Sequence, residues 1–277
     1  MLPNLVIIGA EKSGTSSLHY YLSLHSDIHM SKQKELNFFN ENLSRKKGLA
    51  WYERQFSTRH RVNGETSPHY TRYPHEKGVV RYMHEVIPQA KLIYILRDPV
   101  ERALSAYFDA WCGYGEDRSV EEAFQDLENN IYVDVSRYHF QLEQYLKYYP
   151  LDRILVLTAE ELKDQREAVL KKVFRFLGVD ENFFCREFAR MLNRSKERYR
   201  RTRKEKPGWI KRRVLMAVQA CLPGAVSRII IRWVERAVPF ERPSVPEDLQ
   251  KKLTEILHDD VQKLRELTGI PFSTWSV

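Results

Sequence analysis

The chain has few cysteines and no long apolar run. Its three cysteines, Cys112, Cys185 and Cys221, are odd in number and far apart, a spacing that suits neither a disulfide framework nor a metal cluster. No run approaches the ~20 apolar residues of a membrane-spanning helix, and because the first apolar segment begins within a few residues of Met1 we expect no signal peptide. The chain also lacks internal repeats and low-complexity linkers. We therefore expect a cytoplasmic globular protein with no metal site.

What remains is ordinary for a soluble enzyme, since 43% of the 277 residues are hydrophobic and 30% are charged. Apolar and amphipathic segments alternate along the chain, which predicts an α/β fold with a mainly parallel central sheet and helices on both faces. The predicted strands are residues 4–9, 62–66, 91–96 and 153–158, and the main predicted helices are 14–24, 100–112, 136–149, 168–177 and 246–268. We expect one domain over 1–277, in which 185–277 form a helical, basic C-terminal part.

The first twenty residues contain the clearest motif, an apolar strand followed by a glycine- and hydroxyl-rich loop and a helix. Backbone amides at such a helix N-terminus can hold a phosphate or sulfate group. Gly9 and Gly14 have the separation of a nucleotide-triphosphate loop, but Thr15 stands where its lysine belongs and Lys12 lies inside the loop. The strand before and the helix after argue against an incidental turn. The predicted binding residues are Lys12, Ser13, Gly14, Thr15 and Ser16.

A second motif follows the strand at 91–96. Arg97 ends this strand, at the edge of the sheet where ligands of open α/β folds bind. Asp98 suits a helix N-cap and Pro99 the first helical position. Ser105 lies about two helical turns further on, so Arg97 and Ser105 could jointly hold a second phosphate. Taken alone, the segment is explained more simply as a helix cap with a surface ion pair.

Positive charge is concentrated in one segment. Residues 190–213 contain twelve Lys or Arg against two Glu, so the remainder of this +8 chain sums to −2. Such a block indicates an anionic partner, whether nucleotide, acidic glycan, membrane or nucleic acid, unless it is merely a solvated loop. Residues 209–240 place apolar side chains between arginines, as interfacial helices do. A pair of helices packed on the sheet is the favoured alternative.

Together these segments resemble the sulfotransferases that use 3′-phosphoadenosine-5′-phosphosulfate (PAPS), most closely the branch with heparan sulfate and many bacterial sulfotransferases. Residues 32–39 (KQKELNFF) are similar to its K-E-x-x-F-F segment, residues 47–52 (KGLAWY) to K-G-x-x-W-Y, and residues 64–70 (GETSPHY) to G-E-K-[ST]-P-x-Y. Tyr138 and Trp275 also have counterparts. The resemblance covers nearly the whole chain and implies a P-loop-like three-layer fold.

The resemblance also implies which residues bind the nucleotide. The first loop would hold the 5′-phosphosulfate, with Lys12 stabilising the departing phosphate. Arg97 and Ser105 would hold the 3′-phosphate, and Tyr138 would belong to the same site. In the basic block, residues 193–200 are similar to the family's 3′-nucleotide loop and point to Arg198 and Arg200. No metal is required in such a site.

Glu35 is the residue that the resemblance assigns as general base for the acceptor hydroxyl. Lys34 would hold Glu35 ionised or contact the sulfate, although a solvated lysine fits nearly as well. Thr66 departs from the family, which usually has lysine there. His69 is a second candidate for base or acceptor contact, and a polar loop histidine is the simpler explanation.

The sequence therefore predicts a PAPS-dependent sulfotransferase acting on a hydroxyl, or less readily an amine, of a glycan, glycolipid or small metabolite. The acceptor could be anionic or lipid-linked, with peripheral membrane contact through 209–240, and we expect no nucleic-acid partner. Two other functions stay open. A P-loop kinase is disfavoured by the displaced lysine and by the lack of an acidic magnesium site. The second alternative function is non-enzymatic binding of an acidic glycan or a nucleic acid through residues 190–213.

Overall fold

A computed structural model describes residues 1–41, 45–57, 59–113, 115–190 and 244–277. A five-stranded sheet has the order β2-β3-β1-β4-β5, and every pairing in it is parallel. The strands are β1 (Leu5–Gly9), β2 (Ile28–Met30), β3 (Val62–Thr66), β4 (Lys91–Leu96) and β5 (Ile154–Thr158). The predicted α/β fold with a central parallel sheet is confirmed, and β2 is a short strand that the sequence analysis missed.

Ten α-helices and four short 3-10 helices are found in the described part of the chain. The α-helices are α1 (Thr15–Ser23), α2 (Leu49–Glu53), α3 (Val79–Val86), α4 (Pro99–Gly113), α5 (Val120–Ala123), α6 (Ile131–Asp134), α7 (Tyr138–Leu146), α8 (Ala159–Asp164), α9 (Arg166–Leu177) and α13 (Glu247–Thr268). The 3-10 helices are η1 (Arg45–Lys47), η2 (Pro68–Thr71), η3 (Leu151–Arg153) and η4 (Arg186–Ala189).

The sheet belongs to a compact unit made of residues 1–106, 124–192 and 245–277. A second unit comprises 107–123 and 193–244, of which the described residues include the second half of α4 and α5. The predicted basic block beyond residue 190, with Arg198, Arg200 and the segment 209–240, lies outside the described residues. The expectation of a single domain with a helical C-terminal part remains a prediction.

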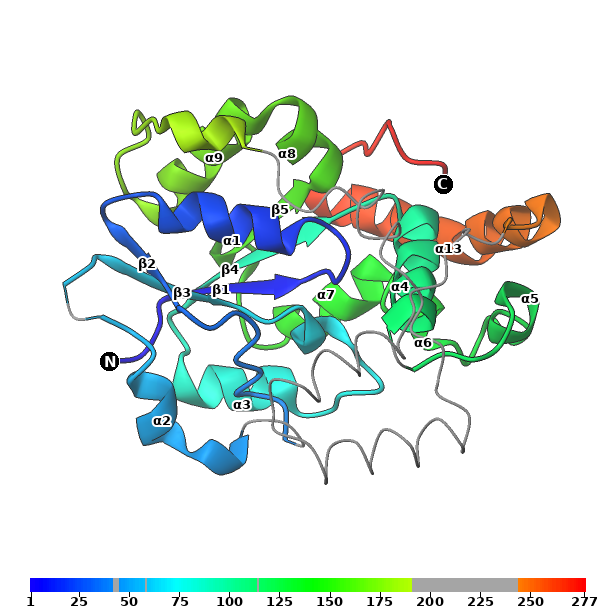
Figure 1. Cartoon of the computed structure of the whole chain (residues 1–277), viewed down its shortest axis with the longest axis horizontal. Helices are drawn as coiled ribbons and strands as arrows, with labels where there is room; N and C mark the ends of the chain where they lie inside the picture. The colour runs from blue at the N-terminus through cyan, green and yellow to red at the C-terminus, as the bar shows by residue number, and fades with distance from the viewer. Residues whose placement is uncertain (42–44, 58, 114, 191–243) are drawn as a thin grey trace, which may run out of the picture. The chain divides into compact units, whose positions relative to one another are not determined.

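The sheet of the first unit is buried on both faces, as parallel sheets are. Alternate residues of β1 point to opposite sides, so Val6 and Ile8 join one apolar cluster while Leu5 and Ile7 join the other. Helices α1, α8 and α9 cover one face, and α3, α7 and α13 cover the other (Figure 1). The carboxyl ends of β1, β3 and β4 lie side by side at one edge.

Local signals placed several helix ends correctly. The Asp98 carboxylate accepts a hydrogen bond of 2.9 Å from the Glu101 amide, so it caps α4, and Pro99 takes the first helical position as predicted. Gly178 ends α9 in the left-handed conformation. The helix predicted over 136–149 is shorter and forms α7, whose first turn is held by the Asp260 carboxylate of α13, which accepts from the amides of His139 and Phe140.

No helix of the described residues is both long enough and apolar enough to span a membrane.

Gly9 provides a test of the packing behind the first loop. A Cβ at this position would lie 2.2 Å from Thr71 Oγ1 and 3.0 Å from Tyr94 Cε2. Gly9→Ala should therefore lower the free energy of unfolding by about 1–3 kcal/mol through overpacking, as measured by urea denaturation. Gly115→Ala is the control, because a Cβ there has no heavy atom within 4 Å. Equal stability of the two variants would contradict this explanation.

Candidate active site

The first loop connects β1 to α1 in a tight turn. The Ala10 amide donates to the Ile95 carbonyl at 2.7 Å, which ties the loop to β4. Two residues have left-handed backbone conformations, Lys12 with φ 69° and Gly14 with φ 90°. Gly14 precedes the first residue of α1, whose N-terminal amides form the type of site that binds phosphate or sulfate. The turn thus brings predicted residues 12–16 together around one helix end.

Tyr138 joins this loop to the end of β4. Its hydroxyl donates to the Arg97 carbonyl at 2.8 Å and lies beside the side chain of Ser13. The ring is fully buried and packs near Tyr94 and Trp275. Burial raises the pKa of Tyr138 well above its ordinary value, so the phenol stays neutral and donates. Residues from three predicted motifs therefore meet here.

Arg97 directly follows β4, as the sequence predicted, and its assignment as a phosphate contact stays a prediction. Its guanidinium donates to Glu101 Oε2, through Nε at 3.1 Å, and the Glu101 side chain is 61% exposed. Ser105 is buried on the same helix, within the same unit. The segment thus contains the helix cap and the surface ion pair of the simpler explanation, and we expect an anion at Arg97 to compete with Glu101.

Glu35 lies next to the end of β3. Its amide donates to the Thr66 carbonyl at 2.8 Å, and its carboxylate accepts from Lys34 Nζ at 2.7 Å. Glu35 and Asn37 have φ values of 63° and 49°. Left-handed residues other than glycine cost about 1–3 kcal/mol each, and they persist only where surrounding contacts enforce them.

A fully buried carboxylate, that of Glu65, stabilises the left-handed backbone of the Glu35 segment. Glu65 accepts hydrogen bonds from Tyr52 at 2.6 Å, Ser67 at 2.6 Å and Tyr70 at 3.0 Å. The Ser67 hydroxyl in turn accepts from the Asn37 amide at 3.0 Å. This network runs from β3 to the Glu35 segment and holds its unusual backbone. Burial raises the pKa of Glu65, although the three hydroxyl donors oppose that shift.

A pair of charges that the sequence analysis missed flanks the first loop. Arg72 donates to Glu11 Oε2 at 2.6 Å. Burial alone would raise the pKa of Glu11, but Arg72 outweighs it and the pKa is lowered. His69 lies within electrostatic reach of Glu11, Arg72 and Glu35, and its burial together with Arg72 lowers its pKa. His69 is therefore neutral at pH 7, as proton transfer by an imidazole requires.

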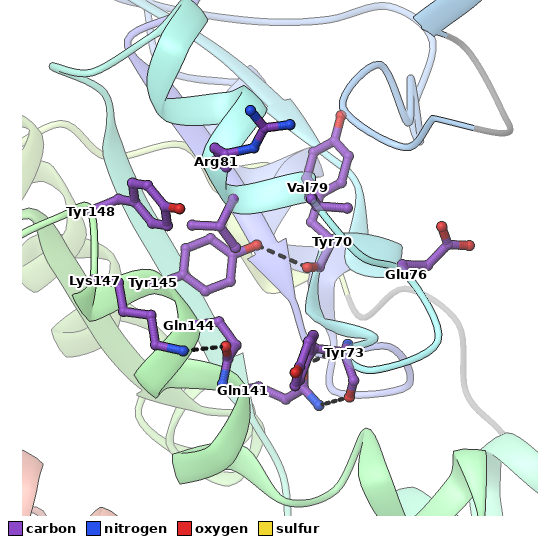
Figure 2. Close-up of a pocket in the computed structure, with 12 residues that line it drawn as sticks. Tyr70, Tyr73, Glu76, Val79, Arg81, Gln141, Gln144, Tyr145, Lys147 and Tyr148 are labelled. Atoms are coloured by element: carbon purple, nitrogen blue, oxygen red, sulfur yellow. Dashed lines mark hydrogen bonds between the residues drawn. The ribbon is translucent and has the colours of Figure 1, made fainter.

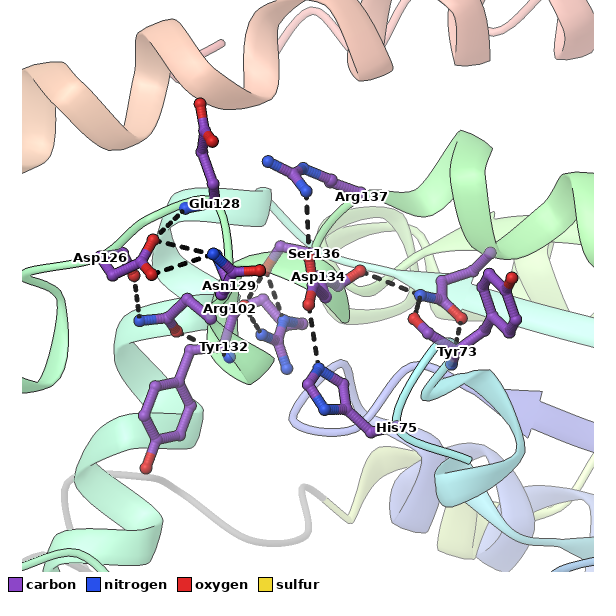
Figure 3. A network of polar contacts seen from close by, with 12 residues as sticks. Tyr73, His75, Arg102, Asp126, Glu128, Asn129, Tyr132, Asp134, Ser136 and Arg137 are labelled. Carbon is purple, nitrogen blue, oxygen red and sulfur yellow. Dashed lines mark hydrogen bonds and ion pairs between the residues drawn. The ribbon is translucent and has the colours of Figure 1, made fainter. Parts of the chain in front are cut away.

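A buried arginine supports the same region from behind. Arg102 is 1% exposed, donates to Ser136 Oγ at 2.7 Å and also donates to the Tyr132 carbonyl (Figure 3). Burial lowers the pKa of Arg102, and the nearby Glu11 opposes that shift. In the same network the buried Asp134 accepts from Arg137 at 3.0 Å and contacts His75 at 2.9 Å. The Arg102 contacts hold α4 against α6, and the contact between Asp134 and His75 joins α6 to the segment that follows η2.

A pocket of about 160 Å³ lies between α3, α7 and the segment that follows η2 (Figure 2). Tyr73, Tyr145 and Tyr148 line it, and the Tyr145 hydroxyl donates to the Tyr70 carbonyl at 2.9 Å. None of the predicted site residues lines this pocket.

No group of three or more potential metal ligands occurs in the part of the chain that is described.

The pH dependence of stability tests the Glu65 network. Because burial raises the pKa of Glu65 above 4.5, the native state keeps a proton that the unfolded state releases. The contribution of Glu65 to the free energy of unfolding should be greatest below about pH 4.5 and should be lost as the pH rises through its native pKa. Glu65→Gln should flatten this slope in denaturant titrations. Glu255→Gln, an exposed change on α13, should leave it unchanged, and equal slopes in all three proteins would contradict the assignment.

Comparison with known proteins identifies relatives of the whole arrangement. A family model described as a sulfotransferase domain matches residues 2–214. Human bifunctional heparan sulfate N-deacetylase/N-sulfotransferase 2 is 27% identical over 242 residues, which cover 71% of this chain and 26% of that protein. Mouse heparan sulfate glucosamine 3-O-sulfotransferase 5 is 26% identical over 280 residues, with 97% of this chain and 72% of the relative covered.

Among solved structures, a sulfotransferase from Alicyclobacillus acidocaldarius superimposes with a TM-score of 0.71 at 26% identity, over the full length of both chains. This chain spans about a quarter of the length of the human relative. These relatives confirm the resemblance that the motifs indicated. The chain belongs to the sulfotransferase domain family.

Proposed function

We propose that this enzyme transfers the sulfuryl group of PAPS to a hydroxyl, or less readily an amine. One observation carries the proposal. The carboxyl ends of three neighbouring parallel strands bring together a phosphate-type loop with Lys12, the Glu35 segment and the Arg97–Ser105 helix. A donor with phosphate groups at both its 5′ and 3′ positions needs two such anion sites.

The reaction needs a base, a positioned sulfur and stabilisation of the leaving group. The acceptor oxygen forms a bond to sulfur while the bond from sulfur to the 5′-phosphate oxygen breaks. The acceptor proton passes to the Glu35 carboxylate. The electron pair of the broken bond stays on the phosphate of adenosine 3′,5′-bisphosphate, where Lys12 stabilises it. No metal takes part in this scheme.

Each side of the proposed site has supporting groups. Lys34 Nζ donates to Glu35 at 2.7 Å, and we assign it to contact the sulfate beside the proposed base. His69 is neutral at pH 7 and within electrostatic reach of Glu35, which makes it the second candidate for the base. Residues 12–16, Arg97, Ser105 and Tyr138 would bind the nucleotide. Arg198 and Arg200 remain predictions for its 3′-phosphate.

The acceptor is proposed as a glycan, a glycolipid or a small metabolite. Relatives named for heparan sulfate support a glycan, and the cationic block at 190–213 favours an anionic one. Cytoplasmic location, peripheral membrane contact through 209–240 and the lack of a nucleic-acid partner remain predictions. A P-loop kinase is the second candidate, and the position of Lys12 disfavours it.

Nucleotide binding and turnover test this proposal directly. Adenosine 3′,5′-bisphosphate should bind without magnesium in calorimetry, and Lys12→Ala and Arg97→Ala should each weaken binding at least tenfold, the loss expected when a charge-assisted hydrogen bond is removed. Glu35→Gln should bind the bisphosphate normally but lose about 10²- to 10⁴-fold in kcat. The assay would use labelled PAPS with chemically desulfated heparin, with p-nitrophenol and with water alone as acceptors.

Three outcomes would count against the proposal. No bisphosphate binding would remove its basis, and tighter magnesium-dependent ATP binding would favour the kinase. Full turnover by Glu35→Gln would exclude Glu35 as the base and make His69 the next residue to substitute.

The Arg97–Glu101 pair makes a separate prediction. Glu101→Gln should tighten bisphosphate binding by up to about fivefold, because an exposed ion pair that competes for Arg97 is worth at most about 1 kcal/mol. Glu85→Gln is the matched control, since Glu85 pairs with Arg81 at the same i,i+4 spacing on α3. Isothermal titration of both variants would detect the difference, and an unchanged or weaker affinity of Glu101→Gln would show that Glu101 does not compete with the ligand.

A further inference from the structure

His19 links the phosphate-loop helix to the acceptor side of the site. It lies on α1, and its Nδ1 is 2.9 Å from the hydroxyl of Thr66 at the end of β3. The ring also forms a hydrogen bond with the backbone of Ser31, at the end of the strand that precedes the Glu35 segment. Thr66 and Ser31 are fully buried. One imidazole therefore connects three segments that build the site.

The protonation of this ring determines which way its hydrogen bonds run. Burial and the nearby Lys34 lower the pKa of His19 to about 4, so the ring is neutral at pH 7. A neutral imidazole has one donor and one acceptor nitrogen. The tautomer whose N–H donates to the Ser31 backbone leaves Nδ1 to accept the proton of the Thr66 hydroxyl.

This arrangement gives Thr66 two structural bonds. Its hydroxyl is directed to His19, and its carbonyl accepts from the Glu35 amide at 2.8 Å. With its side chain buried and its proton committed to His19, Thr66 has no hydrogen to offer a bound sulfuryl group. Lys34, which donates to Glu35 at 2.7 Å and lies close enough to lower the pKa of His19, places a cation beside this segment.

We propose that His19 is a positioning residue for sulfuryl transfer. It clamps the end of β3 to α1, and thereby fixes Glu35 relative to the phosphate loop and leaves Lys34, rather than residue 66, to face the sulfuryl group. His19 does not touch the reacting atoms. This inference rests on the proposed function, because it states that His19 sets the distance between the proposed base, Glu35, and the proposed donor site in the phosphate loop.

Substitutions that remove or restore single hydrogen bonds test the inference. His19→Leu removes both bonds of the ring, and Thr66→Val removes only the hydroxyl. Each should lower kcat by about ten- to a hundredfold, because small misplacements of reacting groups are costly, while the KM for PAPS and the Kd for adenosine 3′,5′-bisphosphate stay within about twofold. His19→Asn keeps an acceptor near the position of Nδ1 and should restore most of the turnover, as should Thr66→Ser.

The double variant His19→Leu/Thr66→Val should be no slower than His19→Leu, because the two residues act through one contact.

His29→Leu is the control, since His29 on β2 also has one ring nitrogen at 3.1 Å from a backbone carbonyl, that of Gln55. Turnover would be measured with labelled PAPS and desulfated heparin, and with water as the acceptor. Thermal melting would verify folding, and Thr66→Val with its Thr66→Ser rescue carries the test if His19→Leu does not fold.

A lowered melting temperature with unchanged kcat in His19→Leu and Thr66→Val would overturn the positioning role. Additive losses in the double variant would overturn it as well. These results differ from a failure of the proposed function, in which the unsubstituted enzyme itself neither binds the bisphosphate nor releases it from PAPS.

Discussion

The site depends on the pairing of β1 with β3 on one side and with β4 on the other. Leu5 is in register with Gly64 in β3 and with Lys91 in β4, so the three strands end at the same edge of the sheet. Each strand is buried on both faces, and a shift of one residue would exchange its two sets of apolar side chains. The register therefore determines which loops meet, and it brings the phosphate-type loop between the Glu35 segment and Arg97.

The charged side chains at this edge of the sheet form ion pairs near the surface, whereas those buried below it are held by hydrogen bonds. Glu35 pairs with Lys34, and Arg97 with the exposed Glu101. Exposed pairs of this kind contribute about 0–1 kcal/mol, so an incoming anion can replace a partner at little cost. Beneath them, Glu65 and Arg102 are buried and form hydrogen bonds that would be expensive to break. The surface groups can thus exchange partners while the backbone that carries them stays in place.

Short-range signals made much of this fold predictable. The strand ending at Gly9 and the Asp98 cap were readable because each depends on residues close together in the chain. β2 was missed because three residues are too few to show a periodicity. The Glu11–Arg72 pair and the His19–Thr66 contact join residues 61 and 47 positions apart. Nothing in either local sequence predicts such contacts, because they arise only when the parallel strands bring distant loops together.

The most direct test of the central claim is a crystal structure of the enzyme with adenosine 3′,5′-bisphosphate. The account predicts the 5′-phosphate on the amides of residues 12–16 with Lys12 in contact, the 3′-phosphate on Arg97 and Ser105, and Glu35 facing the 5′-phosphate across an open space for the acceptor. A bisphosphate bound elsewhere, or bound here with Glu35 turned away from its 5′-phosphate, would contradict the account.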